Sequence, residues 1–237
     1  PVPGSPFPSR IVAGDTSVFG CLSTGEGRFR GVAGVPETIT IDTADLYGNV
    51  KTYGGDIFPW EITRIFQGVE YKIGGIADDD GDGSYQFTYI ATTAATYTLN
   101  VKLIAQLYPD PGEFIVDSPW FNVKIQPAPA AASHCVATGE NVYLALSGYS
   151  STYWIKAYDM YDNERTEGGD VFTVTLAGPT SVPDCKDAPG TEPDCVNVLD
   201  MSFGEYIVAY TADISGAYNM SVTLTQTNFK GSWTDFI

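Results

Sequence analysis

Asp78–Leu103 reads DDDGDGSYQFTYIATTAATYTLNVKL and decides the fold of this 237-residue chain. A turn rich in Gly and Asp opens the stretch, and two segments with alternating apolar residues follow it. The residues that share one face are Tyr85, Phe87 and Tyr89 in the first segment, and Tyr97, Leu99, Val101 and Leu103 in the second. Period-two alternation of aromatic and β-branched residues between turn residues is typical of strands. The sequence predicts that the two segments pair as a β-hairpin.

The same pattern returns at Gly204–Leu224, where Tyr85 and Tyr97 find their counterparts 121 positions later in Tyr206 and Tyr218. Other motifs return 114 positions later. They are Cys21-Leu-Ser-Thr-Gly-Glu as Cys135-Val-Ala-Thr-Gly-Glu, and Gly54-Gly55-Asp56 as Gly168-Gly169-Asp170. One module therefore occurs twice, and the second copy has gained residues between Asp170 and Tyr206.

Each module has roughly 110 residues and about seven short strands, the size of an immunoglobulin-like sandwich. The fold class expected is therefore all-β, with two tandem immunoglobulin-like β-sandwich domains at residues 8–127 and 128–237. The Pro/Ala segment QPAPAAAS at residues 126–133 is expected to join them as a semi-rigid linker. Residues 1–7 contain Ser5-Pro6-Phe7, which matches Ser118-Pro119-Trp120 in the last strand of the first module. We expect residues 1–7 to be the tail strand of a preceding repeat, or a strand that pairs with another chain.

The composition narrows the classes of function. A formal net charge of −17 repels phosphate, which argues against nucleic acids and anionic membrane surfaces as partners. An acidic surface also keeps a protein soluble without any specific ligand. No apolar run is long enough to cross a membrane, so no membrane span is expected in this segment.

The chain has four cysteines, which could form disulfides, remain free thiols or bind a metal. Cys185 and Cys195 flank the loop CKDAPGTEPDC, which has little apolar content of its own, so a local disulfide between them is predicted. Such a bridge would imply an oxidising compartment. Cys21 and Cys135 occupy equivalent places in the two modules and are expected to be partly buried thiols that do not pair. With His134 as the only histidine, no zinc site is expected.

The acidic turn has two interpretations. Asp78, Asp80 and Asp82 with Gly83 match the D-x-D-x-D-G start of a calcium loop, whose alternating oxygens suit that cation. The twelfth position of such a loop is Tyr89, where a bidentate Glu is needed. The alternative is a tight turn that uses Asp and Gly for their backbone conformations.

Two further surface sites follow from short motifs. Asn219-Met220-Ser221 is an N-glycosylation sequon, and Asn219 alternates out of phase with its apolar neighbours, so it should face solvent. The match is a matter of chance if the protein is cytosolic. Trp60 and Trp120 could stack on a sugar ring, but tryptophans in such strands more often pack in the core or at a strand edge, and nothing in the sequence selects the sugar interpretation. Because no nucleophile motif surrounds any serine, no enzymatic activity is expected.

These residues resemble the filamin-type repeat. DGDGSYQFTYIATTAATYTLNVKL followed by SPWFNVKI is similar to that family's successive strands, and PETITIDTADLYGN resembles its second strand. The opening PGSPF is similar to the end of a third repeat. The second module departs from the pattern, because residues 199–204 replace the DGDG turn and the final strand lacks its proline. The Cys185–Cys195 loop is a further departure from the animal cytoskeletal versions.

The resemblance implies a rod of spacer modules, some of which bind a partner peptide as an added strand beside their third strand. On this sequence that groove is expected near residues 58–65 and 171–176. The residues assigned to it are Phe58, Trp60, Ile62, Val171 and Thr173.

Three functions are expected from the sequence. The first is a structural or adhesion module pair of an extracellular or cell-surface protein, with protein partners at strand edges and at the Cys185–Cys195 loop, and with self-assembly through residues 1–7. The second is a cytoplasmic, filamin-like rod segment that links the cytoskeleton to partner tails. The third is a calcium- or carbohydrate-binding module. No cofactor is expected in the first two. The redox state of the cysteines distinguishes the first function from the second.

Overall fold

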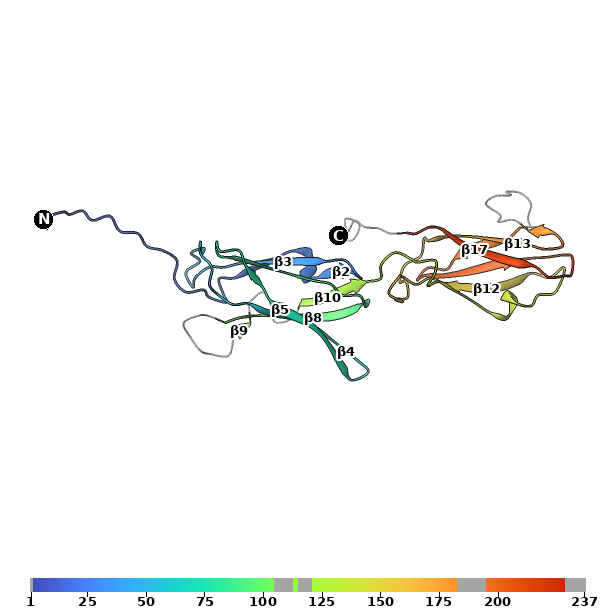
Figure 1. Ribbon diagram of the computed structural model, residues 1–237, viewed down its shortest axis with the longest axis horizontal. Helices are drawn as coiled ribbons and strands as arrows, with labels where there is room; N and C mark the ends of the chain where they lie inside the picture. The colour runs from blue at the N-terminus through green and yellow to red at the C-terminus, as the bar shows by residue number, and fades with distance from the viewer. Residues whose placement is uncertain (1, 105–112, 115–120, 183–194, 229–237) are drawn as a thin grey trace. The chain divides into compact units, whose positions relative to one another are not determined.

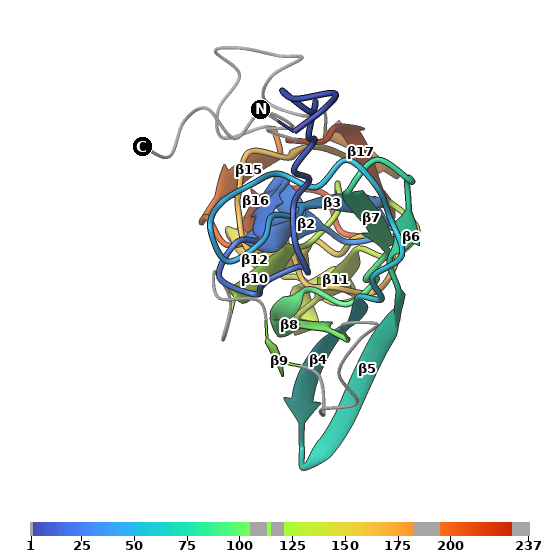
Figure 2. The ribbon, with the colours of Figure 1, turned by 90° about the vertical axis from the view of Figure 1, so that its left-hand side faces the viewer.

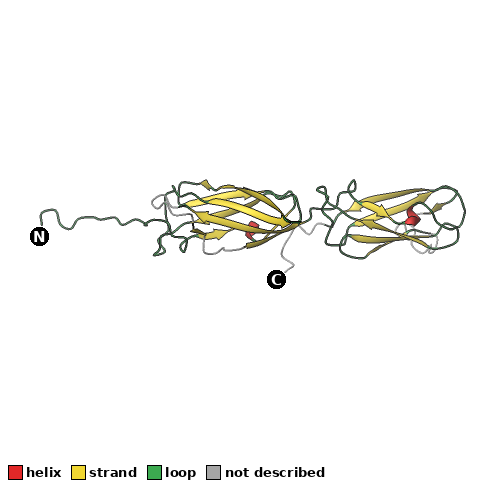
Figure 3. Cartoon of the chain, turned by 90° about the horizontal axis from the view of Figure 1, so that it is seen from below, coloured by secondary structure: helices red, strands yellow, loops and turns green. Residues whose placement is uncertain are grey.

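The computed structural model describes residues 2–104, 113–114, 121–182 and 195–228. The chain divides into two compact units, residues 1–125 and 126–237, which we call domain 1 and domain 2. Both consist of β-strands apart from two 3-10 turns, η1 (Glu26–Arg28) and η2 (Glu140–Val142) (Figures 1 and 3). No helix in the described ranges is long and apolar enough to cross a membrane. Residues 2–7, expected to be a strand, lie exposed and outside any strand.

Domain 1 is a sandwich of two sheets. The first sheet has, in spatial order, β1 (Leu22–Thr24), β3 (Glu37–Asp42), β7 (Ser84–Tyr89) and β6 (Asp78–Asp79). The second has β2 (Arg30–Val32), β10 (Phe121–Gln126), β8 (Ala95–Leu103), β4 (Pro59–Phe66) and β5 (Val69–Ile76), and β9 (Glu113–Phe114) pairs with β8. The all-β, tandem sandwich prediction is confirmed.

The predicted hairpin between β7 and β8 is wrong, because the two strands belong to different sheets. β7 pairs with β3 and β6, whereas β8 pairs with β10 and β4. Their apolar faces meet across the core, where Tyr85 packs against Phe58 and Trp60 stacks on Phe87, each with ring centroids 4.6 Å apart. The alternation correctly identified two strands with one buried face, but a sandwich allows these faces to oppose one another without the strands pairing.

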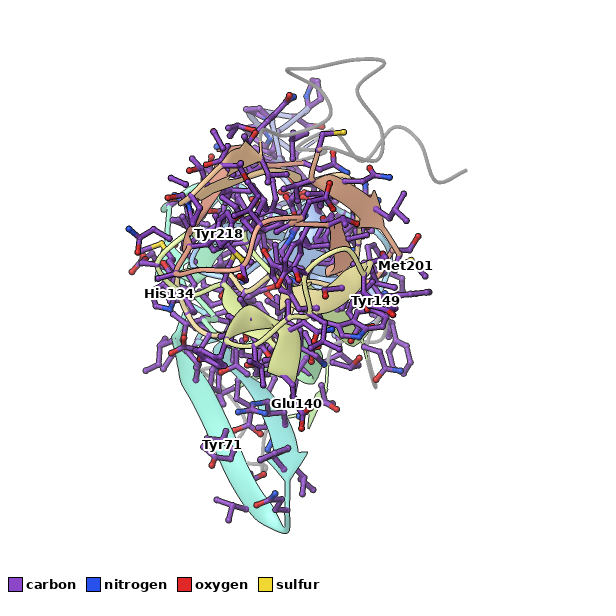
Figure 4. The ribbon with its side chains drawn as sticks, turned by 90° about the vertical axis from the view of Figure 1, so that its right-hand side faces the viewer. Tyr71, His134, Glu140, Tyr149, Met201 and Tyr218 are labelled. Carbon is purple, nitrogen blue, oxygen red and sulfur yellow. The ribbon has the colours of Figure 1, made fainter. Side chains whose placement is uncertain are left out.

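The hairpin of β4 and β5 projects from domain 1 (Figure 2). Gln67 and Gly68 both have positive φ, 50° and 78°, as the tight turn of a two-residue hairpin requires. Beyond the sandwich the residues of β5 are mostly exposed. Tyr71 lies on this projecting part (Figure 4), with the Arg64 guanidinium carbon 4.5 Å from its ring centroid. This cation–π contact stabilises the projecting β4–β5 hairpin, which has little core of its own.

Domain 2 has the same two-sheet architecture, with fewer described strands. One sheet has β11 (Val136–Thr138), β12 (Ser151–Lys156), β16 (Glu205–Tyr210) and β15 (Asn197–Asp200); the other has β14 (Ser181–Val182), β13 (Val171–Ala177) and β17 (Asn219–Gln226). Here too the strands predicted as a hairpin, β16 and β17, lie in different sheets. Phe172 of β13 meets Tyr206 of β16 across the core, with ring centroids 4.8 Å apart.

Candidate protein-contact edges and the loops that support them

The edge predicted to receive a partner strand differs between the domains. In domain 1 the edge of β4 that corresponds to the predicted groove pairs with β5 from Pro59 to Phe66, so it is not available to an added strand. Phe58, Trp60 and Ile62 are buried in the core and cannot contact a partner directly. The domain 1 part of the groove prediction therefore needs correction. Alternation alone could not reveal that the following segment folds back onto β4.

In domain 2 the corresponding edge is largely unpaired within the part of the chain that the structure describes. β13 pairs with β17 on one side, and on the other side β14 covers only Leu176 and Ala177. Among the described residues, nothing pairs with the second edge over Val171–Thr175. Val171 and Thr173 lie on the outer face and are half-buried, while Phe172 points into the core. An unpaired edge of this kind is a template for an added strand.

The acidic turn of domain 1 uses its carboxylates as turn caps. Asp82 accepts hydrogen bonds from the Ser84 backbone N–H at 3.0 Å and from its hydroxyl at 2.6 Å. Asp80 accepts one from the Gln86 amide at 3.2 Å, and Asp78 lies in β6. The described ranges contain no group of three or more His, Cys, Asp or Glu residues placed to hold a metal ion. Calcium binding at Asp78, Asp80 and Asp82 stays a prediction.

In each domain, the carboxylate of an Asp and the side-chain amide of an Asn hydrogen-bond to each other in the loop beside which the chain enters the domain. In domain 1, Asp45 accepts hydrogen bonds from the Asn49 side chain, from the Gly14 N–H at 2.9 Å and from the Tyr47 and Asn49 N–H groups. Asp159 in domain 2 accepts the equivalent bonds from Asn163, Tyr161 and the Ala128 N–H, the last at 2.8 Å. The repeated Asp-x-Tyr-x-Asn sequence thus ties the incoming chain to the loop that begins at the aspartate.

Lowering the pH should destabilise domain 1 through Asp45. The Asn49 side chain and the backbone donors hold the pKa of this carboxyl at about 2, below its ordinary value of 3.8. Because the unfolded chain binds the proton first, stability present at neutral pH is lost as the pH falls from about 5 to 2. We expect Asp45→Asn to flatten this part of the curve of unfolding free energy against pH. Asp42→Asn, an exposed change on β3, is the control; equal slopes in the two variants would contradict the assignment.

Buried ion pairs occupy matched places in the two domains. Lys51 Nζ lies 2.7 Å from Asp56 Oδ2 and donates to Thr16 Oγ1 at 2.7 Å. In domain 2, Arg165 takes the place of Lys51, and its Nε lies 3.6 Å from Asp170 Oδ2. These pairs join loops inside each sandwich.

The remaining predicted sites are placed as follows. Asn219 is exposed at the start of β17, and its glycosylation stays a prediction. Cys21 and Cys135 carry free thiols. Cys195 is buried, but Cys185 lies outside the described residues, so their bridge also stays a prediction. Trp60 is buried against Phe87 and offers no sugar platform, and Trp120 lies outside the described residues.

Comparison with solved structures supports the architecture. The Escherichia coli adhesin FdeC matches 92% of this chain and 63% of its own with a TM-score of 0.56 and 16% identity. Invasin, a bacterial integrin-binding protein, matches 90% of this chain and 39% of its own with a TM-score of 0.51 and 17% identity. The chain is a tandem of immunoglobulin-like β-sandwich domains. At these identities the likeness concerns the fold alone.

Comparison with curated sequences supports a repeat protein. Filamin-C of Rattus norvegicus is 29% identical over 224 residues, which cover 94% of this chain but only 7% of filamin-C. No protein-family model matches the chain. The chain therefore carries immunoglobulin-like repeats and spans a small part of the length of this relative.

Proposed function

We propose that this chain is a non-catalytic structural and adhesion module pair of an extracellular or cell-surface repeat protein. It acts as a spacer and makes protein contacts through its strand edges. The observation that carries the proposal is the repetition of one sandwich design in two units, together with a strand edge at Val171–Thr175 of domain 2 that pairs with nothing among the described residues. The adhesin folds and the filamin-C likeness support the same class.

In this proposal the polar side chains of His134, Asp56 and Asp170 hold loops in place and have no catalytic role. His134, the chain's only histidine, bonds through Nδ1 to Asp162 Oδ1 at 2.6 Å, on the side of a partly exposed turn. The Asp56 carboxylate pairs with Lys51 and accepts a hydrogen bond from the Thr16 hydroxyl. The Asp170 carboxylate pairs with Arg165 and accepts a hydrogen bond from the Asn228 N–H. A general base needs a reacting group within hydrogen-bond reach, and these side chains are already engaged in loop contacts.

A cytoplasmic rod segment is the second candidate, favoured by the filamin-C identity. Strand addition at β13 would serve it equally well, since that mode of binding depends on main-chain hydrogen bonds and not on compartment. Surface location is favoured instead by the predicted Cys185–Cys195 bridge, by the exposed sequon at Asn219 and by the net charge of −17. Calcium or carbohydrate binding finds no comparable support in the described residues.

The deciding experiment measures the intact mass of the natively produced chain after thiol alkylation in denaturant, with and without prior reduction. Denaturant is required because burial raises the pKa of the Cys21 thiol to about 12, so the folded chain reacts slowly there. The proposal expects two alkylated thiols before reduction, four after it, and a glycan that Asn219→Gln removes. Four thiols alkylated at once, with the mass of the bare sequence, would overturn the surface assignment in favour of the cytoplasmic rod.

A further inference from the structure

The strand β5 lies at the edge of its sheet in domain 1, on the hairpin that projects from the sandwich (Figure 2). Within the described ranges it pairs only with β4. Its residues are exposed apart from Ile73, which is half-buried. β4 separates it from β8, β9 and β10, the strands that flank residues 105–112 and 115–120 in the chain. An exposed strand edge of this kind can accept a further strand.

The two-residue turn decides which main-chain groups lie on the outer edge of β5. In such a hairpin the residues that flank the turn form a hydrogen-bonded pair, and these pairs alternate along the strands. Every second residue from Val69 to Ala77 therefore bonds to β4, and the Ala77 N–H does donate to the Phe58 carbonyl at 2.9 Å. The residues between them, which include Glu70 and Lys72, direct their N–H and C=O groups outward.

The two faces of β5 differ in chemistry. Glu70 and Lys72 share one face, where Lys72 also pairs with Glu61 of β4. Glu70 makes no salt bridge with any described residue. On the other face Val69 is 54% exposed and Tyr71 (labelled in Figure 4) is 45% exposed. An acid and a base two positions apart are self-complementary, because each can face the other when two identical strands run antiparallel.

Charge selects one register for two antiparallel β5 strands. A two-fold axis at Glu70 or at Lys72 places like charges directly opposite one another, which is unfavourable. An axis at Ile73 leaves both charged residues opposite uncharged ones. An axis at Tyr71 places Glu70 opposite Lys72 on both sides of the axis. It also places Val69 opposite Ile73 and brings the two Tyr71 side chains together on the apolar face.

We propose that β5 of one copy of the chain pairs antiparallel with β5 of a second copy, about a two-fold axis at Tyr71. The inference rests on the proposed function and deepens it by naming a second copy as the partner of one strand edge. The outward main-chain groups of Glu70 then bond to those of Lys72 in the other copy. The contact is isologous and closes at a dimer. Because only residues 69–73 of each copy pair, we expect a weak dimer that depends on concentration.

A cysteine on the axis tests the register. Oxidation of chains with Tyr71→Cys should give a disulfide-linked dimer, because opposed residues in a non-hydrogen-bonded pair have Cα atoms about 4.5 Å apart. Val69→Cys is the matched control, since Val69 is on the same face and similarly exposed. Its two copies would lie four residues apart along the strands, about 13 Å, which is too far to bridge. The unaltered chain measures the background from Cys21 and Cys135.

Exchange of the charges provides the second measurement, by light scattering during size exclusion. The mass of the unaltered chain should rise with concentration towards that of a dimer. Glu70→Lys alone and Lys72→Glu alone oppose like charges on both sides of the axis, so each should weaken the dimer by about tenfold or more. An equimolar mixture of the two variants should restore it, because each Lys then faces a Glu. Asp42→Lys, an exposed change on β3, should have no effect.

A monomer at every concentration would overturn the proposal and leave the β5 edge to a different protein. Equal cross-linking of Tyr71→Cys and Val69→Cys, or a dimer that persists in both charge variants, would also overturn it. Tyr71→Cys keeps both native charges, so the cross-link tests the pairing even where a charge variant unfolds the hairpin. None of these results changes the cysteine and glycan masses, so the proposed function can fail or hold separately.

Discussion

Replacing Lys51 with methionine is expected to lower the free energy of unfolding of domain 1 by about 3–5 kcal/mol. The ammonium and the Asp56 carboxylate are 2.7 Å apart, and their side chains are only 5% and 7% exposed. Methionine keeps most of the volume but leaves the Asp56 charge buried without its cation. The measurement is urea unfolding of the full chain, with hydrogen exchange of peptides from each domain to show which one is destabilised.

Lys72→Met provides the control for this prediction. Lys72 pairs with Glu61 on the projecting hairpin, and its side chain is 55% exposed, so water screens the interaction. The expected loss of unfolding free energy is therefore much smaller than for Lys51→Met. The double variant Lys51→Met, Asp56→Asn should recover part of the loss, because the uncompensated charge is gone. Similar losses for Lys51→Met and Lys72→Met would show that the buried pair is not the cause.

Leu99→Ala should destabilise domain 1 by about 2–5 kcal/mol, since Leu99 is fully buried and truncation leaves a cavity. Met220→Ala, the same position in domain 2, should cost about 1 kcal/mol or less because the side chain is only partly buried and lines a cavity. Urea unfolding of the full chain, with hydrogen exchange of peptides from each domain, measures both. Equal losses at the two positions would contradict the difference in burial between Leu99 and Met220.

Much of the fold could be predicted because the physical signal is local. The alternation of Tyr85, Phe87 and Tyr89 marks a strand with one buried face, and the repeated motifs mark two copies of one sandwich. The pairing of strands could not be predicted in the same way, because alternation indicates which face of a strand is buried but not which neighbouring strand supplies the hydrogen bonds. That is why β7 and β8 were wrongly predicted to pair.

The contact edges could be predicted only in part. Val171–Leu176 was correctly placed on a strand, but the free edge depends on whether the next segment returns to it, as β5 does in domain 1 and β14 does only briefly in domain 2. Gln67-Gly68 was the available signal for the β4–β5 hairpin, because this pair suits a turn with positive φ. The partial burial of Met220 and Leu224 gave no signal in the sequence of β17, which keeps the apolar alternation of β8.

The loop bonds of Asp159 set the path that mechanical load takes into domain 2. Ala128 is held at its N–H by Asp159 and at its carbonyl by Arg165, so a pull on the preceding residues reaches this clamp before it reaches β11. Several short hydrogen bonds must then break together, because Asp159 and Arg165 act on the same residue. Domain 1 has the corresponding bond between Gly14 and Asp45. A rod of such modules would resist stretching first at its junctions, and each sandwich would stay folded until its clamp yields.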